Sequence, residues 1–207
     1  MVASTGQKAR LFDLMIEVGD LVREGHRDAD EVLRLLQDVK DGKLGVLHGR
    51  LRPVGEVQLP ARTEPFDPKV FFRTREGLWV WDKFVDRVLS VVNPTEAALE
   101  ATLQSFDLVL PASDKKIRAE LPEGHAFDDA GVFSANLAGM IGRQPNGEQG
   151  DLLTSGYANI FYVRGLGDEV FAVDVDWDSH VRGWRVVAGS LGHFRWGAGR
   201  RVFSSNC

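Results

Sequence analysis

The feature that most constrains the fold is a strict alternation of apolar and acidic residues in "VDVDWD", residues 173–178. Successive side chains of a β-strand point to opposite faces of a sheet, so a strand would separate the two kinds of residue. One face would carry Val173, Val175 and Trp177, and the other would carry Asp174, Asp176 and Asp178. This alternation is typical of a sheet with one buried side.

Three more segments near the C-terminal end are rich in β-branched and aromatic residues. They are "NIFYVRG" (159–165), "GWRVVAGSL" (183–191) and "RRVFS" (200–204), and glycine-bearing turns separate them. This composition predicts short strands. We therefore expect an antiparallel sheet within residues 151–207, with Arg201 to Ser204 as the closing strand that holds the chain end in place.

Residues 1–42 have the pattern of a helical hairpin. Apolar residues recur at steps of three and four between Leu11 and Val22, with acidic residues on the other face. A second helix follows in "EVLRLLQDVKDG" and is expected to end at Gly42. Such hairpins serve as oligomerisation or docking units about as readily as they serve as domain caps, so this one could join copies of the chain into a homo-oligomer.

Residues 43–69 differ from the segments on either side because they contain four prolines. Pro53, Pro60, Pro65 and Pro68 exclude a continuous helix. We interpret the segment as either a linker or a short extended segment. Residues 70–207 are then expected to form one α+β domain whose β-rich end is 151–207.

The middle of the chain is predicted to be mostly helical. Trp81 to Val92 share an apolar face until Asn93-Pro94 ends the helix, and "TEAALEATLQSF" (95–106) is the most helix-prone segment. A short helix is expected after Ser113-Asp114, and another from Asp128 or Asp129. The predicted fold class is therefore α+β, with helical N-terminal and middle regions packed on a C-terminal antiparallel β-sheet.

Charge and cysteine content limit the environment and the partners. The 207 residues carry a net charge of -5, which makes nucleic acid an unlikely partner. The single cysteine is Cys207, so an intrachain disulfide is excluded and a reducing cytoplasm is expected. No segment reaches the roughly 18–20 apolar residues that span a bilayer, so we expect no membrane association.

The acidic row is the first candidate site. Carboxylates two residues apart on a strand lie about 7 Å apart, a spacing that suits magnesium or calcium if a loop adds further oxygens. Asp174, Asp176 and Asp178 are thus candidate metal ligands, and with His180 they could serve a divalent-cation-dependent hydrolase or nuclease. A divalent cation is the one cofactor that the sequence suggests. Alternatively, the row pairs with Arg182 and Arg185 across a hairpin and only fixes its register.

The second candidate site lies after residue 180, where arginines and aromatic residues interleave without any acidic residue. Arginine gives bidentate contacts and aromatic rings give flat apolar area, a mixture that suits an anionic or aromatic ligand. The candidate contact set is Trp184, Arg185, Arg195, Trp196 and Arg200. The alternative is that the arginines pair internally with the aspartates and that the rings are buried.

Linear motifs do not indicate an enzyme. The chain contains no Gly-x-Ser-x-Gly elbow, Walker loop, dinucleotide fingerprint or metalloprotease signature. We therefore expect a non-catalytic binding or interaction module that acts through its β-rich C-terminal region, on a protein or small-molecule ligand that the sequence does not identify.

Two resemblances to known groups of proteins involve the part of the chain that follows the proline-rich segment. From Gly77 onward, segments such as "GLWVWDKFVDRVLS", "IGRQPNGEQGDLL" and the ending Trp-x-x-Gly-x-Arg-Val-Phe-Ser resemble a group of uncharacterised bacterial proteins found mainly in candidate-phyla genomes. That resemblance implies a helical part followed by a β-rich end, and no activity. Residues 184–204 also resemble the final strands of C-type-lectin-like domains, including the variable proteins of diversity-generating retroelements, although the Gly-Gly-Ser-Trp run of that group is missing. This second resemblance implies a diversified ligand-binding surface.

Overall fold

The computed structural model describes residues 5–24, 28–40, 49–61, 64–94 and 100–205, and it divides the chain into two units, Met1–His48 and Gly49–Cys207. The first unit contains α1 (Thr5–Arg23) and α2 (Ala29–Lys40). The two helices predicted for this part of the chain are confirmed. No helix in the described part of the chain is both long enough and apolar enough to cross a membrane.

The second unit is built around a seven-stranded mixed sheet with the order β1-β3-β9-β5-β6-β7-β2. The strands are β1 (Leu51–Leu59), β2 (Leu78–Val80), β3 (Ala101–Leu108), β5 (Asn159–Arg164), β6 (Val170–Asp178), β7 (Gly183–Ser190) and β9 (Arg200–Ser205). A separate pair joins β4 (Ala112–Ser113) to β8 (Arg195–Trp196). Strand β2 runs parallel to β7 and β9 runs parallel to β5, whereas the other neighbouring strands are antiparallel.

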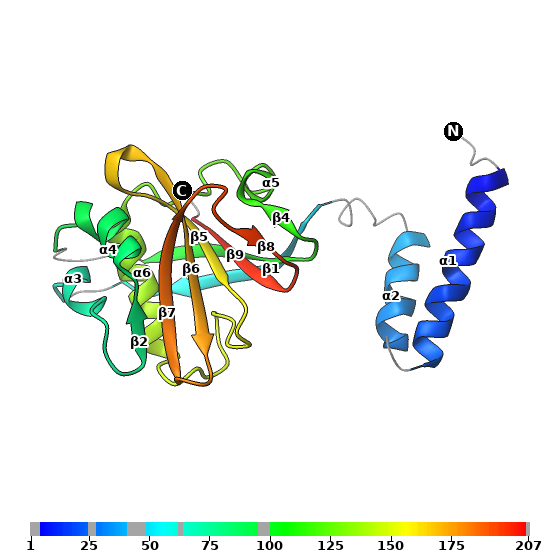
Figure 1. The fold of residues 1–207 in the computed structure, drawn as a ribbon, viewed down its shortest axis with the longest axis horizontal. Helices are drawn as coiled ribbons and strands as arrows, with labels where there is room; N and C mark the ends of the chain where they lie inside the picture. The colour runs from blue at the N-terminus through cyan, green and yellow to red at the C-terminus, as the bar shows by residue number, and fades with distance from the viewer. Residues whose placement is uncertain (1–4, 25–27, 41–48, 62–63, 95–99, 206–207) are drawn as a thin grey trace. The chain divides into compact units, whose positions relative to one another are not determined.

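Two apolar clusters cover the two faces of this sheet. Figure 1 shows α3, α4 and α6 on one side of the strands and α5 on the other. The first contains side chains of α4 (Asp82–Arg87) and α6 (Ala130–Arg143), near α3 (Pro68–Phe71) and the 3-10 helix η2 (Leu89–Val91). The second contains side chains of α5 (Asp114–Arg118), β4 and β8. The alternation within β5 separates them, because Phe161 belongs to the first cluster and Ile160 and Tyr162 belong to the second.

The predicted α+β class is confirmed, but two parts of the prediction need correction. Ala101–Leu108, which lies largely in the predicted helix 95–106, is strand β3, and residues 95–99 lie outside the described residues. The proline-rich segment takes the extended form that the sequence left open, because Leu51–Leu59 is strand β1, and this strand adds to the sheet predicted for the C-terminal end. The sheet is therefore mixed and takes strands from the middle of the chain as well as from its C-terminal end.

The C-terminal segment is the closing strand that the sequence predicts, and it lies inside the sheet. Strand β9 pairs with β3 on one side and with β5 on the other. Val202 and Phe203 are completely buried, one in each cluster. The ring of Phe203 stacks on Phe161 with centroids 4.7 Å apart.

Helix α6 begins where the sequence places it. Asp129 is the N-cap, and its side chain accepts hydrogen bonds from the backbone N–H groups of Gly131 and Val132 at 2.7 and 3.0 Å. The helix buries ten residues along its length, among them Phe133 and Leu137. It thereby supplies much of the cover for the first cluster.

Because β9 lies in the middle of the sheet, we expect Phe203 to contribute strongly to the stability of the fold. Phe203→Ala should lower the free energy of unfolding by about 3–5 kcal/mol, because it leaves a cavity in the first apolar cluster. Urea titration followed by circular dichroism measures this change. Val181→Ala, at a side chain that is 48% exposed, is the control and should cost less than about 0.5 kcal/mol. A loss below about 1 kcal/mol for Phe203→Ala would contradict the central role of the strand.

Candidate functional site

Most of the acidic row is engaged in cross-strand ion pairs. Asp176 lies opposite Arg185 in the β6–β7 register, and Arg185 contacts Asp176 at 2.7 Å and Asp178 at 3.1 Å. The predicted charge pairing is confirmed for Arg185. Arg182 lies in the turn with a φ of +51° and is exposed. Beside these charges, Trp177 and Trp184 pack edge to face with centroids 5.4 Å apart.

The three aspartates do not form a metal centre. Within the described ranges, no group of three or more His, Cys, Asp or Glu side chains lies close enough together to hold a metal ion. Asp176 and Asp178 share the guanidinium of Arg185, and His180 is an exposed turn residue whose backbone N–H bonds to Asp178. Of the candidate metal ligands, Asp174 is thus a half-buried carboxyl, and Asp176 and Asp178 are ion-paired with one arginine.

Asp174 has an unusual environment. Burial and the neighbouring charge of Asp176 raise the pKa of Asp174 to about 7, although Arg200 and Arg185 oppose this shift. Its Oδ1 atom and the Nε atom of Arg200 are both buried without a hydrogen-bond partner in the described part of the chain. Arg200 also lies over the ring of Tyr157, with 5.8 Å between Cζ and the ring centroid.

The five residues of the arginine and tryptophan set do not form one surface. Trp184 is fully buried in the first cluster and donates from Nε1 to the carbonyl oxygen of Gln144. Trp196 is 3% exposed and belongs to the second cluster, on the other face of the sheet. Arg185 is ion-paired, Arg200 is half-buried, and Arg195 is exposed opposite Ser113.

Trp196 instead forms part of a buried group of polar side chains around Asp114. This residue is 1% exposed, and its carboxylate accepts hydrogen bonds from Trp196 Nε1 at 2.7 Å, Tyr162 Oη at 3.1 Å and the backbone N–H of Gly192 at 2.6 Å. Burial and the charge of Asp114 raise the pKa of Tyr162, which keeps its hydroxyl protonated as a donor. The three bonds hold α5, β5 and the β7–β8 connection together.

A pocket of about 500 Å³ opens beside this buried group, and we call it the α5 pocket. It is lined by Ser113, Lys115, Arg118, Ala119, His125, Leu191 and Gly192. Two of these side chains are cationic and none is acidic. Asp114 is not among the lining residues, and both of its oxygens already accept hydrogen bonds, Oδ1 from Tyr162 and Trp196 and Oδ2 from the N–H of Gly192.

Two contacts fix the orientation of the Arg118 side chain in the α5 pocket. Its Nε donates to His125 Nε2 at 3.0 Å, and its guanidinium lies over the ring of Tyr162 with 5.7 Å between Cζ and the centroid. His125 Nδ1 in turn lies 3.1 Å from the carbonyl oxygen of Pro122, which makes Nδ1 the donor and Nε2 the acceptor. Burial and the charge of Arg118 lower the pKa of His125, so the imidazole is neutral at pH 7.

The arrangement leaves the outer edge of the Arg118 guanidinium available. Among the described residues, no carboxylate lies within ion-pair distance of Arg118 or Lys115, and no side chain or carbonyl accepts from the Nη groups of Arg118. The tyrosine ring and the neutral histidine therefore orient a cation without neutralising it. A fixed, uncompensated guanidinium in a pocket is a recognition group for anions.

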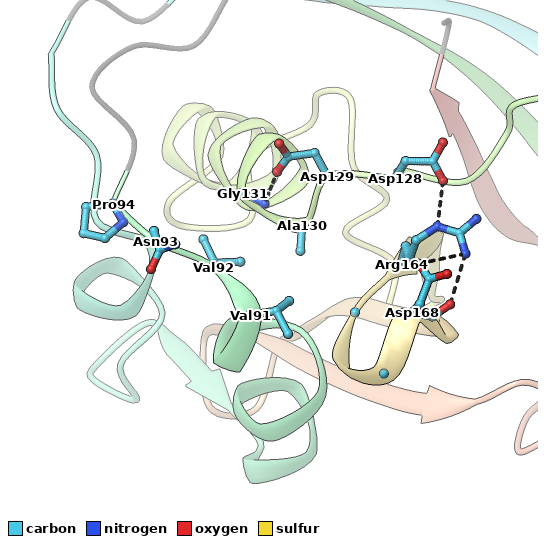
Figure 2. A pocket seen from close by; sticks show the side chains of 12 residues that line it. Val91, Val92, Asn93, Pro94, Asp128, Asp129, Ala130, Gly131, Arg164 and Asp168 are labelled. Carbon is cyan, nitrogen blue, oxygen red and sulfur yellow. Dashed lines mark hydrogen bonds and ion pairs between the residues drawn. The ribbon is translucent and has the colours of Figure 1, made fainter.

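In a second pocket, of about 540 Å³, the charged side chains already pair with one another or with the backbone (Figure 2). It lies between the start of α6, the segment Val91–Pro94 and the β5–β6 connection. Figure 2 shows Arg164 between Asp128 and Asp168, with ion-pair distances of 3.0 and 3.4 Å. Asp129 caps α6. The charged groups of this pocket are therefore engaged with one another or with the backbone, and the α5 pocket is the better candidate site.

Sequence reasoning identified none of the cationic residues of the α5 pocket. It interpreted Ser113-Asp114 as a helix cap, whereas the Ser113 side chain makes no capping bond and Asp114 is a buried acceptor. The run "SDKKIR" contains Lys115 and Arg118, but two basic residues in a short predicted helix are an ordinary surface pattern. The local signal is too weak to separate these residues from solvent-facing ones.

The raised pKa of Asp174 predicts a dependence of stability on pH. A carboxyl whose pKa is raised in the folded state adds stability that is fully present below its unfolded pKa of about 3.9 and is lost as the pH rises through about 7. Asp174→Asn should therefore unfold at higher urea concentration than the unmodified protein at pH 8 and should show a smaller loss between pH 5 and pH 8. Asp168→Asn, at an exposed carboxylate, is the control. An unchanged pH profile in Asp174→Asn would contradict the assignment.

Comparison with known proteins identifies no family. No family model matches the chain, and no curated protein or solved structure matches it. The two resemblances described from the sequence therefore stay predictions. The function has to be inferred from the geometry of the α5 pocket.

Proposed function

We propose that this protein binds an anionic small molecule in the α5 pocket. The proposal keeps the expected class, a non-catalytic binding module, and assigns its recognition to Arg118 and Lys115. The pocket uses the β-rich end of the chain through Leu191 and Gly192, and it uses α5 for the positive charges. The reducing cytoplasm and self-association through the helices of 1–42 remain our expectations for location and assembly.

The observation that carries the proposal is the orientation of Arg118 without a carboxylate partner. Ion-paired arginines elsewhere in the unit, such as Arg185 and Arg201, are already used by aspartates of neighbouring strands. Arg118 is held by an uncharged acceptor and an aromatic face, and it lines an open volume. Hydrogen bonds to a charged group contribute about 1.5–3 kcal/mol each, so one bidentate contact is enough for measurable binding.

The two cations would act differently on a bound anion. The half-buried, pre-oriented guanidinium of Arg118 can form two parallel hydrogen bonds to one anionic group. Lys115 is exposed and flexible, so it adds charge without fixing geometry. We therefore expect Arg118 to decide affinity and Lys115 to tune it and its salt dependence.

A second candidate function rests on Asp174. A carboxyl with a pKa of about 7 beside an ion-paired carboxylate resembles the arrangement of general acids in hydrolases. The Oδ1 atom of Asp174 is buried, however, which disfavours direct contact with a substrate. Hydrolysis of chromogenic phosphate esters or glycosides that is lost in Asp174→Asn and kept in Arg118→Ala would select this second function over the first.

The binding proposal is tested with two charge-matched variants. Arg118→Ala and Lys116→Ala each remove one positive charge, but Lys116 is exposed and does not line the α5 pocket. Calorimetric titration with inorganic phosphate, citrate and benzoate should give at least one anion whose affinity falls about 10- to 100-fold in Arg118→Ala. Lys116→Ala should change it less than about 2-fold. Equal affinities in both variants for every anion would contradict the proposal.

A further inference from the structure

The α5 pocket combines one oriented guanidinium with an apolar wall, and from this juxtaposition we infer that its ligand is a small organic monocarboxylate with an apolar body. The inference rests on the proposed function and specifies the chemical class of the anion. It depends on three features of the pocket: its size, the composition of its wall and the number of its polar groups that are still free.

The size of the pocket exceeds what a simple inorganic anion requires. A volume of about 500 Å³ lies within the range of about 300–1,000 Å³ that is typical of sites for organic ligands. An inorganic phosphate or sulfate on Arg118 would leave most of this volume to water. An organic ligand would fill it and would remove apolar surface from water.

Most of the lining surface of the pocket is apolar. Leu191, which is 40% exposed, contributes to it from the β7–β8 connection, and Ala119 contributes to it next to Arg118. Gly192 sets the turn that carries Leu191, because its φ of +83° lies in the left-handed region and its N–H bonds to the buried Asp114. A large exposed aliphatic side chain held by a buried hydrogen bond is available for contact with the body of a ligand.

Few polar groups remain to bind the body of a ligand. Both nitrogens of His125 are engaged, one with Pro122 and one with Arg118, and the N–H of Gly192 is engaged with Asp114. Among the side chains of the described lining residues, this leaves Arg118, Lys115 and the exposed Ser113 hydroxyl, which all come from β4 and α5. One ionic end and one apolar end match an amphipathic carboxylate, and the planar guanidinium matches the carboxylate bidentately.

The test is a titration series of acetate, butyrate, hexanoate and octanoate into the full chain, measured by calorimetry. Burial of each methylene contributes about 0.8 kcal/mol, so the affinity should rise by up to about 4-fold per methylene until the apolar wall is covered. Hexanamide, which has the same shape without the charge, should bind at least about 10-fold more weakly than hexanoate.

Two variants and one control test which lining residue contacts each end of the ligand. Arg118→Ala should weaken every acid of the series by about the same factor, whereas Leu191→Ser should flatten the dependence on chain length and leave acetate unchanged. Val181→Ser, at the exposed apolar residue of the β6–β7 turn, is the matched control for Leu191→Ser and should leave the series unchanged.

The outcomes separate this inference from the proposed function. If inorganic phosphate binds more tightly than octanoate and still depends on Arg118, the α5 pocket is an anion site and the inferred ligand class is wrong. If the affinity does not change with chain length, the inference is also wrong. If no anion binds in a manner that depends on Arg118, the proposed function fails and the inference fails with it.

Discussion

The backbone pairing of β9 between β3 and β5 is the interaction on which the second unit depends. Without it, the pair β1-β3 and the group β5-β6-β7-β2 would be separate sheets. Side chains reinforce the junction, because Arg201 contacts Asp107 at 3.2 Å across 94 positions of the chain. Because Val202 and Phe203 project into opposite clusters, the same strand also contributes to both apolar layers.

The second cluster is organised around a single buried carboxylate. Asp114 accepts from a tryptophan, a tyrosine and a backbone N–H, and these donors come from β8, β5 and the β7–β8 connection. A buried carboxylate is tolerated when its oxygens are satisfied, and the resulting network is rigid. Tyr162 is shared between this network and Arg118, so the buried centre and the cation of the α5 pocket are held by the same ring.

The sequence predicted the strands that carry local signals and missed those that depend on distant pairing. Strand β6 alternates strictly, and the pairing of Asp176 with Arg185 lies within one hairpin, so neighbouring residues were sufficient to find both. Strand β3 was predicted as helix because Ala, Glu and Leu before it favour helix. Its extended form is stabilised by partners on both sides, and intrinsic propensity is a weaker term than such pairing. The α5 pocket was missed because Arg118, His125 and Leu191 come from three segments that only the tertiary fold brings together.

The position of β9 also affects how the chain reaches its folded state. Until β9 is in place, β3 and β5 each expose an edge of unpaired N–H and C=O groups beside apolar side chains. Such edges pair readily with other chains, and strands that join distant parts of a sequence form slowly. Aggregation of incompletely folded chains is therefore the characteristic hazard of this topology, and the expression of the protein should be sensitive to any substitution that delays the docking of its final strand.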